Sequence, residues 1–333
     1  MTEVTLFRSD DLLGIVPPGA PTVLDDAPEH DVMVLEVVGG HLSWSVLSGQ
    51  AIPAAIIDDL DAAQEWIWAI YGEPVALAVA DYRGGRVELP ARPELPRLIG
   101  QAWRLGYAHW AARWWPASTL DGIAALDGAA LEQDIAELTE QCEMLVDGAD
   151  DPFEPPRTAN TAVRQSDYAL AAGGDGRGAV LTLDRGVAGW DWRDCPPGLL
   201  DASEHAVTWE LARDAGLTIA RVTVVAAPGL TGPVPAHLRP RARIAEAAEI
   251  ELELTGDAWV GQTPVAGEES VTVEVYVPGV ATPGGDERDG LEIRTRIREF
   301  AAHRLRRAAE PETGAFDAPL RAEIAAAAED SDF

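Results

Sequence analysis

The sequence predicts an α+β protein made of two domains. The chain has 333 residues, and at roughly 150 residues per domain this length corresponds to about two domains. Hydrophobic residues make up 47% and charged residues 24%, the balance of a soluble globular chain with a sizeable core. Apolar periodicity is mixed in the first half and alternates every second residue in much of the second half. We therefore expect an N-terminal α/β domain with Trp-rich helices over 1–147, a linker over 148–157, a C-terminal antiparallel β-sandwich-like domain with a terminal helix over 158–310, and an Ala- and acid-rich tail over 311–333.

A β-hairpin is the clearest local feature of the first domain. A strand is expected near residues 4–8, and two β-rich segments, Val32–Val38 and His41–Leu47, follow with Gly39-Gly40 between them. Two glycines suit a two-residue turn because both tolerate positive φ. In the returning segment, one alternate set should face the core: Leu42, Trp44 and Val46. The other set should face water or a groove: His41, Ser43 and Ser45.

Helices make up the rest of the first domain. Helical spacing predicts a helix over 56–71, and an apolar run predicts a strand over 75–80. A long helix is expected over about 93–115, ended by Pro116. Its aromatic residues recur at spacings of four, three and four, on one stripe: Trp103, Tyr107, Trp110 and Trp114. A helix apolar over so much of its circumference is buried in its own domain or against a partner. The next helix, over about 127–146, is amphipathic.

The second domain is predicted from the alternation of apolar and polar residues. Residues 147–157 contain Pro, Gly and acids without apolar periodicity, so we expect the chain to divide near 147–158. Glutamates at 249, 251 and 253 alternate with apolar residues, which is typical of antiparallel sheets with one buried face. Strands are expected at 180–183, 204–213, 217–226, 248–255 and 271–277. A helix over 288–308 should bury Leu291, Ile297, Phe300, Ala301 and Leu305.

Charge excludes several kinds of partner. The chain has 56 acidic residues and 25 basic ones, all Arg, for a net charge of −31. An acidic surface repels phosphate, so binding to nucleic acid or to an anionic membrane is not expected. A basic protein partner is compatible with it. The absence of Lys, with abundant Ala, Gly and Pro, is typical of a GC-rich bacterial genome. With no secretory signal and two cysteines, Cys142 and Cys195, the expected location is cytoplasmic.

Motifs for common enzyme classes are absent from the sequence. It contains no Gly-x-x-x-x-Gly-Lys loop, no Gly-x-Ser-x-Gly elbow, no His-Glu-x-x-His pair and no Cys-x-x-Cys. The glycine run 173–178 is interpreted as a loop, since a phosphate cradle needs a strand before it and a helix after it. A cluster of carboxylates is interpreted as solvated charge rather than a cation site: Asp147, Asp150, Asp151 and Glu154. No cofactor and no metal is therefore expected.

One constellation has the minimum chemistry of a general base. Asp201, Glu204 and His205 place carboxylates beside an imidazole, and they are the candidate catalytic residues. No nucleophile accompanies them. Cys195 has no His near it in the sequence.

Two other segments are candidate interfaces. Residues 189–198 contain Trp190, Asp191, Trp192 and Arg193, the residue types of interface hot spots. The favoured interpretation is a long loop whose Trp side chains plug the core while Arg193 pairs with an Asp. Six Arg residues fall between positions 294 and 307. We favour pairing with the protein's own carboxylates over docking on an acidic partner, and the interface candidates here are Arg304, Arg306 and Arg307.

These observations favour a non-enzymatic function. The expected protein is an acidic cytoplasmic scaffold or accessory component of a bacterial multi-protein assembly, bound to an unidentified protein or to a second copy of itself. Two alternatives stay open. One is a hydrolase whose site is assembled across the two domains. The other is an acidic decoy that mimics nucleic acid and blocks a basic groove.

Overall fold

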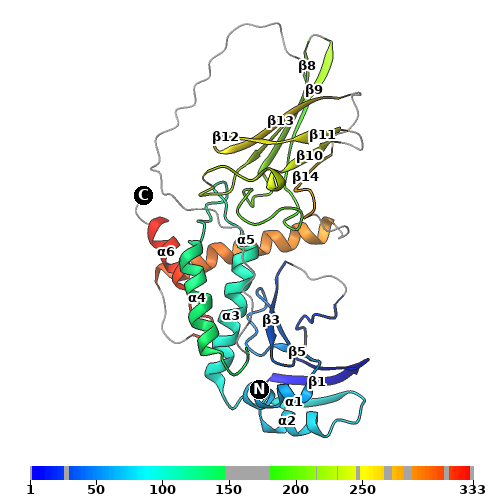
Figure 1. The fold of residues 1–333 in the computed structure, drawn as a ribbon, viewed down its shortest axis with the longest axis vertical. Helices are drawn as coiled ribbons and strands as arrows, with labels where there is room; N and C mark the ends of the chain where they lie inside the picture. The colour runs from blue at the N-terminus through cyan, green and yellow to red at the C-terminus, as the bar shows by residue number, and fades with distance from the viewer. Residues whose placement is uncertain are drawn as a thin grey trace. The chain divides into compact units, whose positions relative to one another are not determined.

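Two compact units make up the chain in the computed structural model, which describes residues 2–25, 30–146, 181–214, 216–230, 232–244, 248–265, 272–280, 287–310 and 315–330. The first unit comprises Met1–Trp115, Leu126–Pro152 and Gly285–Phe333, and the second comprises Pro116–Ala125 and Phe153–Gly284. The α+β class is confirmed, because helices and antiparallel sheets occur together (Figure 1). The expected linker, the glycine run 173–178 and the carboxylate cluster at 147–154 lie outside the described residues.

The first unit contains a six-stranded antiparallel sheet in the order β3-β4-β5-β2-β1-β6. Its strands are β1 (Thr2–Ser9), β2 (Leu12–Val16), β3 (Val32–Val37), β4 (Gly40–Ser45), β5 (Ala54–Ile57) and β6 (Val87–Ala91). The expected hairpin is present, with β3 and β4 paired from Val32–Ser45 to Val37–Gly40, but its two-residue turn is Val38-Gly39 and not the predicted Gly39-Gly40, because Gly40 already belongs to β4. Leu42, Trp44 and Val46 are buried as predicted. Ser43 is buried too, because its hydroxyl donates to the carbonyl of Pro21, 2.7 Å away.

Gly39 connects this hairpin to the first helix. Its φ is +75°, and a side chain there would collide with the Asp59 carbonyl. The amides of Asp58 and Asp59 donate to the Gly39 carbonyl at 3.1 and 3.2 Å. Asp59 then caps the helix, accepting from the amides of Asp61 and Ala62, both at 3.1 Å. The helix therefore begins at residue 60.

The described residues of the first unit form six helices: α1 (Leu60–Tyr71), α2 (Glu73–Ala80), α3 (Pro96–Trp114), α4 (Gly128–Gln141), α5 (Glu287–Ala309) and α6 (Arg321–Asp330). Two sequence predictions in this region were wrong. The start of the expected helix over 56–71 belongs to β5, which pairs with both β4 and β2. The expected strand over 75–80 is the helix α2. Gly72, at φ +90°, separates it from α1, and Pro74 lies in its first turn, where a missing amide costs nothing.

The C-terminal region departs from the expected domain bounds. The terminal helix α5, expected to close the β-rich domain, packs instead with the helices of the first unit. The expected tail contains α6, and Leu320, directly before this helix, and Ala322 and Glu323 within it are fully buried. Ile297 and Ala301 of α5 are fully buried as predicted, whereas Leu291 is 46% exposed. An apolar helical stripe needs a complementary helical face, and the aromatic rings of α3 provide one for α5.

The second unit is all β apart from a short 3₁₀ turn, as far as its residues are described. A five-stranded sheet has the order β12-β13-β9-β8-β7, and a three-stranded sheet has the order β11-β10-β14. Both are antiparallel, with strands β7 (Leu181–Ala188), β8 (Val207–Asp214), β9 (Leu217–Val225), β10 (Arg241–Ile244), β11 (Ala248–Glu251), β12 (Glu253–Thr255), β13 (Ala258–Val265) and β14 (Val273–Tyr276). The single strand expected over 248–255 is divided at Leu252 between the two sheets. Its periodicity continues across the division, which explains the error.

Candidate functional site

Asp201, a candidate catalytic residue, is fully buried in the second unit. Its Oδ1 accepts from the Ser118 hydroxyl at 2.7 Å and the Ser203 amide at 2.9 Å. Its Oδ2 accepts from the Thr119 amide at 2.7 Å. Both oxygens are thus occupied by donors of the protein, and the carboxylate holds the segment Pro116–Ala125 to the rest of the second unit.

The structure does not join the other two candidates to this carboxylate. His205 is exposed, and its backbone amide donates to the Ser203 hydroxyl at 3.2 Å. Glu204 lies against Gly189, where a side chain would collide with its carboxylate. These three residues, which are close together in the sequence, therefore have different surroundings. Asp201 acts as a structural link, and His205 faces solvent.

Both indoles of the Trp-rich loop are buried. Trp190 and Trp192 are 8% and 6% exposed, and the Trp190 indole donates to the Asp201 carbonyl at 2.7 Å. Arg193 pairs with Asp191, with its nearest nitrogen 2.5 Å from Oδ2. This arrangement matches the favoured structural interpretation. The two indoles are not available as exposed interface anchors.

Titratable groups in this loop and elsewhere are shifted by burial. Burial and, to a smaller extent, the Asp191 carboxylate raise the pKa of the Asp194 carboxyl to about 6, against the opposing effect of the Arg193 charge. Burial also raises the pKa of the Cys195 thiol well above its usual range, and that of Cys142 to about 12. A thiol nucleophile needs the opposite shift. Both cysteines are therefore packing residues.

Arg304 is a buried residue with a structural role. Its side chain is 1% exposed, and its Nε and a terminal nitrogen donate to the two carboxylate oxygens of Glu323 at 2.7 and 2.6 Å. The guanidinium lies 4.7 Å from the ring centroid of Tyr107, whose hydroxyl donates to Glu323 at 2.8 Å. Arg307 pairs with Asp317 at 2.6 Å. Of the three interface candidates on α5, Arg306 is exposed.

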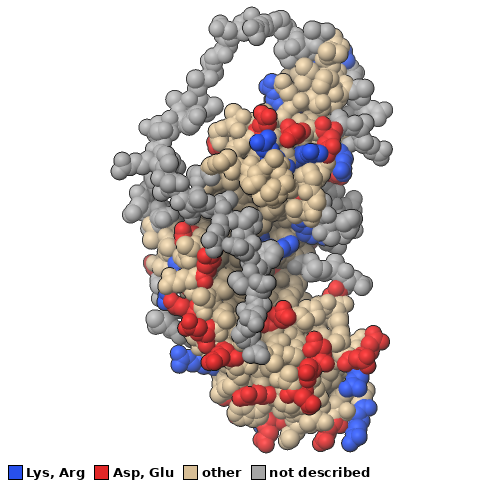
Figure 2. Space-filling model, in the orientation of Figure 1, with Lys and Arg blue, Asp and Glu red and all other residues tan. Residues whose placement is uncertain are grey.

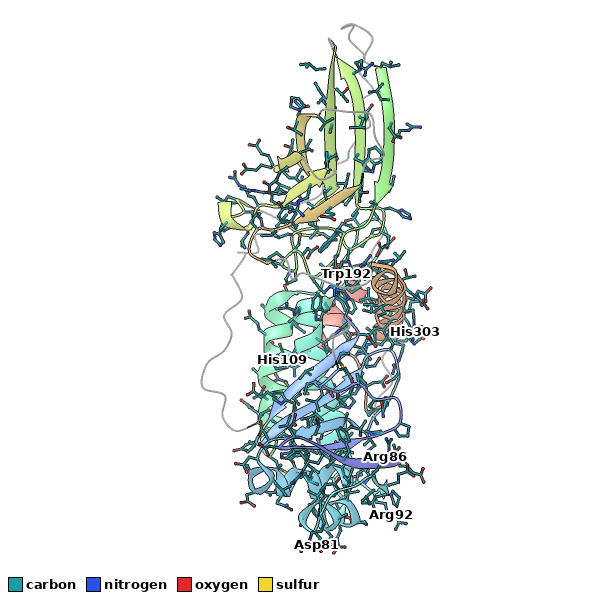
Figure 3. All side chains as sticks on the ribbon, turned by 90° about the vertical axis from the view of Figure 1, so that its right-hand side faces the viewer. Asp81, Arg86, Arg92, His109, Trp192 and His303 are labelled. Atoms are coloured by element: carbon teal, nitrogen blue, oxygen red, sulfur yellow. The ribbon has the colours of Figure 1, made fainter. Side chains whose placement is uncertain are left out.

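The aromatic stripe of α3 is buried in the first unit. Trp103, Tyr107 and Trp110 are at most 4% exposed, and successive rings stack at centroid distances of 5.2 and 5.7 Å. Trp114 is half-buried beneath the guanidinium of Arg113. The predicted burial is thus satisfied by the protein's own helices. Figure 3 labels His109, an exposed residue of the same helix.

A hollow of about 450 Å³ adjoins the C-terminal half of α5. Its described lining consists of His303, Arg306, Arg307, Glu310 and Pro319. His303 is exposed and is labelled on α5 in Figure 3. Arg307 is paired with Asp317, and Glu310 also faces the hollow. The positive charge lining the hollow is therefore partly neutralised.

A surface on α1 and α2 was missed by the sequence analysis. Asp61, Glu65 and Trp68 lie along one stripe of α1, and Glu73 and Leu77 lie on α2. Trp68 is 41% exposed and Leu77 is 60% exposed. The signal was present in the sequence, because residues 58–82 contain six acids and no basic residue. Leu77 was instead placed in the expected strand over 75–80, and Trp68 was assigned no role.

Comparisons with known proteins assign no class. The chain matches no protein-family model, no curated protein and no solved structure. Within the described residues, no three His, Cys, Asp or Glu side chains gather closely enough to bind a metal ion. None of the described helices has the length and hydropathy needed to cross a membrane.

Proposed function

We propose that this protein is a non-enzymatic, acidic accessory or scaffold protein that binds a basic partner protein in a cytoplasmic bacterial assembly. One observation carries the proposal, namely the excess of exposed acid on the first unit. The three stretches of the first unit contain 37 acids and 15 Arg, and those of the second unit contain 19 acids and 10 Arg. Figure 2 shows Asp and Glu side chains spread over the visible face of this unit.

An anionic surface of this kind favours one class of partner. It attracts cationic proteins over distances of about a Debye length, roughly 8–10 Å at physiological salt, and it accelerates their association. It repels nucleic acid and anionic lipid, since both carry the same sign of charge. The aromatic residues of α3 and of the Trp-rich loop are buried and stabilise the fold. Recognition is therefore expected to depend on surface acids and on the few exposed apolar side chains.

The test is native purification of the tagged chain from its source organism, followed by mass spectrometry. We expect stoichiometric recovery of a defined basic protein at about 0.05 M salt and its loss at about 0.5 M, where the Debye length is only a few ångströms. Recovery of a solitary monomer at both salt concentrations would refute the proposal. The decoy alternative predicts that added duplex DNA displaces the partner. A scaffold predicts that the complex survives DNA.

A further inference from the structure

We propose that the outward face of α1 and α2 is the docking site for a basic amphipathic helix of the partner. This inference rests on the proposed function and specifies its binding surface. The α1–α2 face consists of Asp61, Glu65, Trp68, Glu73, Leu77 and Asp81, all of which are exposed. Figure 1 shows the two helices together at one end of the first unit, and Figure 3 labels Asp81 at its outer edge.

The inward face of α1 is completely used by the fold. Ala63, Ile67 and Ile70 are fully buried, and the buried indole of Trp66 donates to the Val38 carbonyl at 2.7 Å. Trp68 lies two residues further along, which is about 200° around a helix, and so faces outward. A large aromatic side chain has thus been placed on the solvent side of a helix whose core positions are already filled.

The apolar and acidic residues of this face form the pattern of a protein interface. Interfaces have an apolar centre surrounded by a polar rim, and Trp is enriched among the residues that dominate binding. Trp68 and Leu77 provide two apolar anchors on consecutive helices. Asp61 and Glu65 share the stripe of Trp68 on α1, Glu73 and Asp81 lie one turn before and after Leu77 on α2, and the first basic residue after α2 is Arg83.

The occupant follows from these features. A helix face offers no backbone edge for strand pairing, so it recognises side chains, and a second helix presents them at spacings of three and four. The 12 residues of α1 extend over about 18 Å, which corresponds to about three turns of a partner helix. A second copy of this chain would place the same acids opposite each other. The geometry and charge therefore point to a basic helix with an apolar stripe.

The experiment uses the full chain and three synthetic peptides. The first is an Arg/Leu peptide of about 16 residues with Leu at helical spacing. The second has the same composition with its Leu residues distributed around the helix, and the third replaces Leu by Ser. Binding is measured by fluorescence anisotropy of labelled peptides. A photoreactive group on the first peptide identifies the contacted residues by mass spectrometry.

Two protein variants are paired with matched controls. Trp68→Ser/Leu77→Ser removes the apolar anchors and retains every charge, and its control is Leu181→Ser/Leu217→Ser, which changes two exposed leucines of the second unit. Asp61→Asn/Glu65→Gln/Glu73→Gln removes three charges, and its control removes three exposed acids elsewhere in the first unit: Glu132→Gln/Glu140→Gln/Glu143→Gln. Circular dichroism establishes that each variant is folded.

We expect the amphipathic peptide to bind at least tenfold more tightly than either control peptide and to crosslink to α1 and α2. Trp68→Ser/Leu77→Ser should weaken it at least tenfold, and the charge variant at least fivefold, with less than a twofold effect in either control.

Equal binding of the three peptides, crosslinks elsewhere or equal losses in the controls would overturn the inference, as would an oligomer of the wild-type chain that Trp68→Ser/Leu77→Ser dissociates. Recovery of the native partner by that variant would overturn this site while leaving the proposed function intact. Failure of the wild type to recover any partner would remove the function itself.

Discussion

Glu323 in the first unit and Asp201 in the second are both fully buried carboxylates, but their partners differ in charge. Glu323 accepts from the Arg304 guanidinium and the Tyr107 hydroxyl, and the ion pair is itself buried. Asp201 accepts from a Ser hydroxyl and from backbone amides. Each joins segments far apart in sequence, by 216 residues for Tyr107–Glu323 and by 83 residues for Ser118–Asp201.

This difference predicts different responses to mutation. Removing one member of a buried ion pair leaves the other charge uncompensated, which is more costly than losing one neutral donor. Glu323 connects α3, α5 and α6, so its loss should loosen three helices together. The backbone at Asp201 is held independently of its side chain, because its amide donates to the Val225 carbonyl at 3.0 Å. Its loss should loosen mainly the segment Pro116–Ala125.

Arg304→Gln should have the largest effect. It leaves the Glu323 carboxylate buried without its cation, and we expect a loss of about 3–5 kcal/mol in the free energy of unfolding. Added salt should not reduce this loss, because buried pairs are screened little. Hydrogen exchange in α6 and urea unfolding of the first unit measure it. Arg306→Gln is the control, since it removes the same charge from an exposed position and should change stability by about 0.5 kcal/mol or less. Equal effects of the two substitutions would contradict the buried ion pair.

Asp201→Asn should have a smaller and more local effect. The amide nitrogen replaces one acceptor oxygen and faces a donor, either Ser118 or Thr119, so we expect a loss of about 1–3 kcal/mol. Hydrogen exchange and proteolysis should increase first in the segment Pro116–Ala125. Asp257→Asn, at an exposed position of the same unit, is the control. A uniform rise in exchange throughout the second unit would show that Asp201 supports the whole β structure.

Asp194→Asn should stabilise the second unit at neutral pH. The folded-state pKa of Asp194, about 6, lies above its ordinary value of 3.8, so the folded state binds the proton more tightly than the unfolded state. Its contribution to stability is therefore present at about pH 4 and is lost as pH rises through 6. Because the carboxyl is partly exposed, we expect a gain of about 1 kcal/mol at pH 7. Thermal unfolding between pH 4 and 8 measures it. A wild-type stability that rises between pH 4 and 6 relative to the variant would have the wrong sign.

Arg307→Gln should have the smallest effect. Its ion pair with Asp317 is partly exposed, at 30% and 25% of the two side chains. We expect a loss of about 0.5 kcal/mol at low salt that disappears at about 1 M salt. Thermal unfolding at both salt concentrations, compared with Arg304→Gln, separates a screened pair from a buried one. A loss that persists at high salt would show that the ion pair of Arg307 is shielded from solvent, like that of Arg304.

Local patterns predicted local structure in this protein. The hairpin followed from two glycines between alternating segments, and the burial of Trp103, Tyr107 and Trp110 followed from helical spacing. The run at 75–80 was ambiguous because a short apolar segment satisfies the spacing of either a buried strand or a helix. Its flanking Gly72 and Pro74 were the discriminating residues.

Long-range partners could not be predicted from these patterns. The Ala- and acid-rich segment after residue 310 resembles a solvated tail in composition, yet Glu323 within it finds Tyr107 and Arg304. His205 lies close to Asp201 in the sequence, yet the Asp201 carboxylate accepts a hydrogen bond from the Ser118 hydroxyl, 83 residues away. Spacing along the chain carries no information about such pairs. The same limitation applied to Trp68, which becomes distinctive only once Trp66 is known to fill the core.

The interruption of the first unit by the second has a consequence for synthesis on the ribosome. Residues up to 284 complete the second unit, whereas the first needs α5 and α6 to cover α3. A ribosome adding about 5–20 residues per second needs about 10–40 s to proceed from Tyr107 to Glu323. Throughout that interval the aromatic stripe of α3 lacks its covering helices, while the later segment is free to fold. The nascent chain therefore carries the uncovered aromatic rings of α3 while about two thirds of its residues are being added.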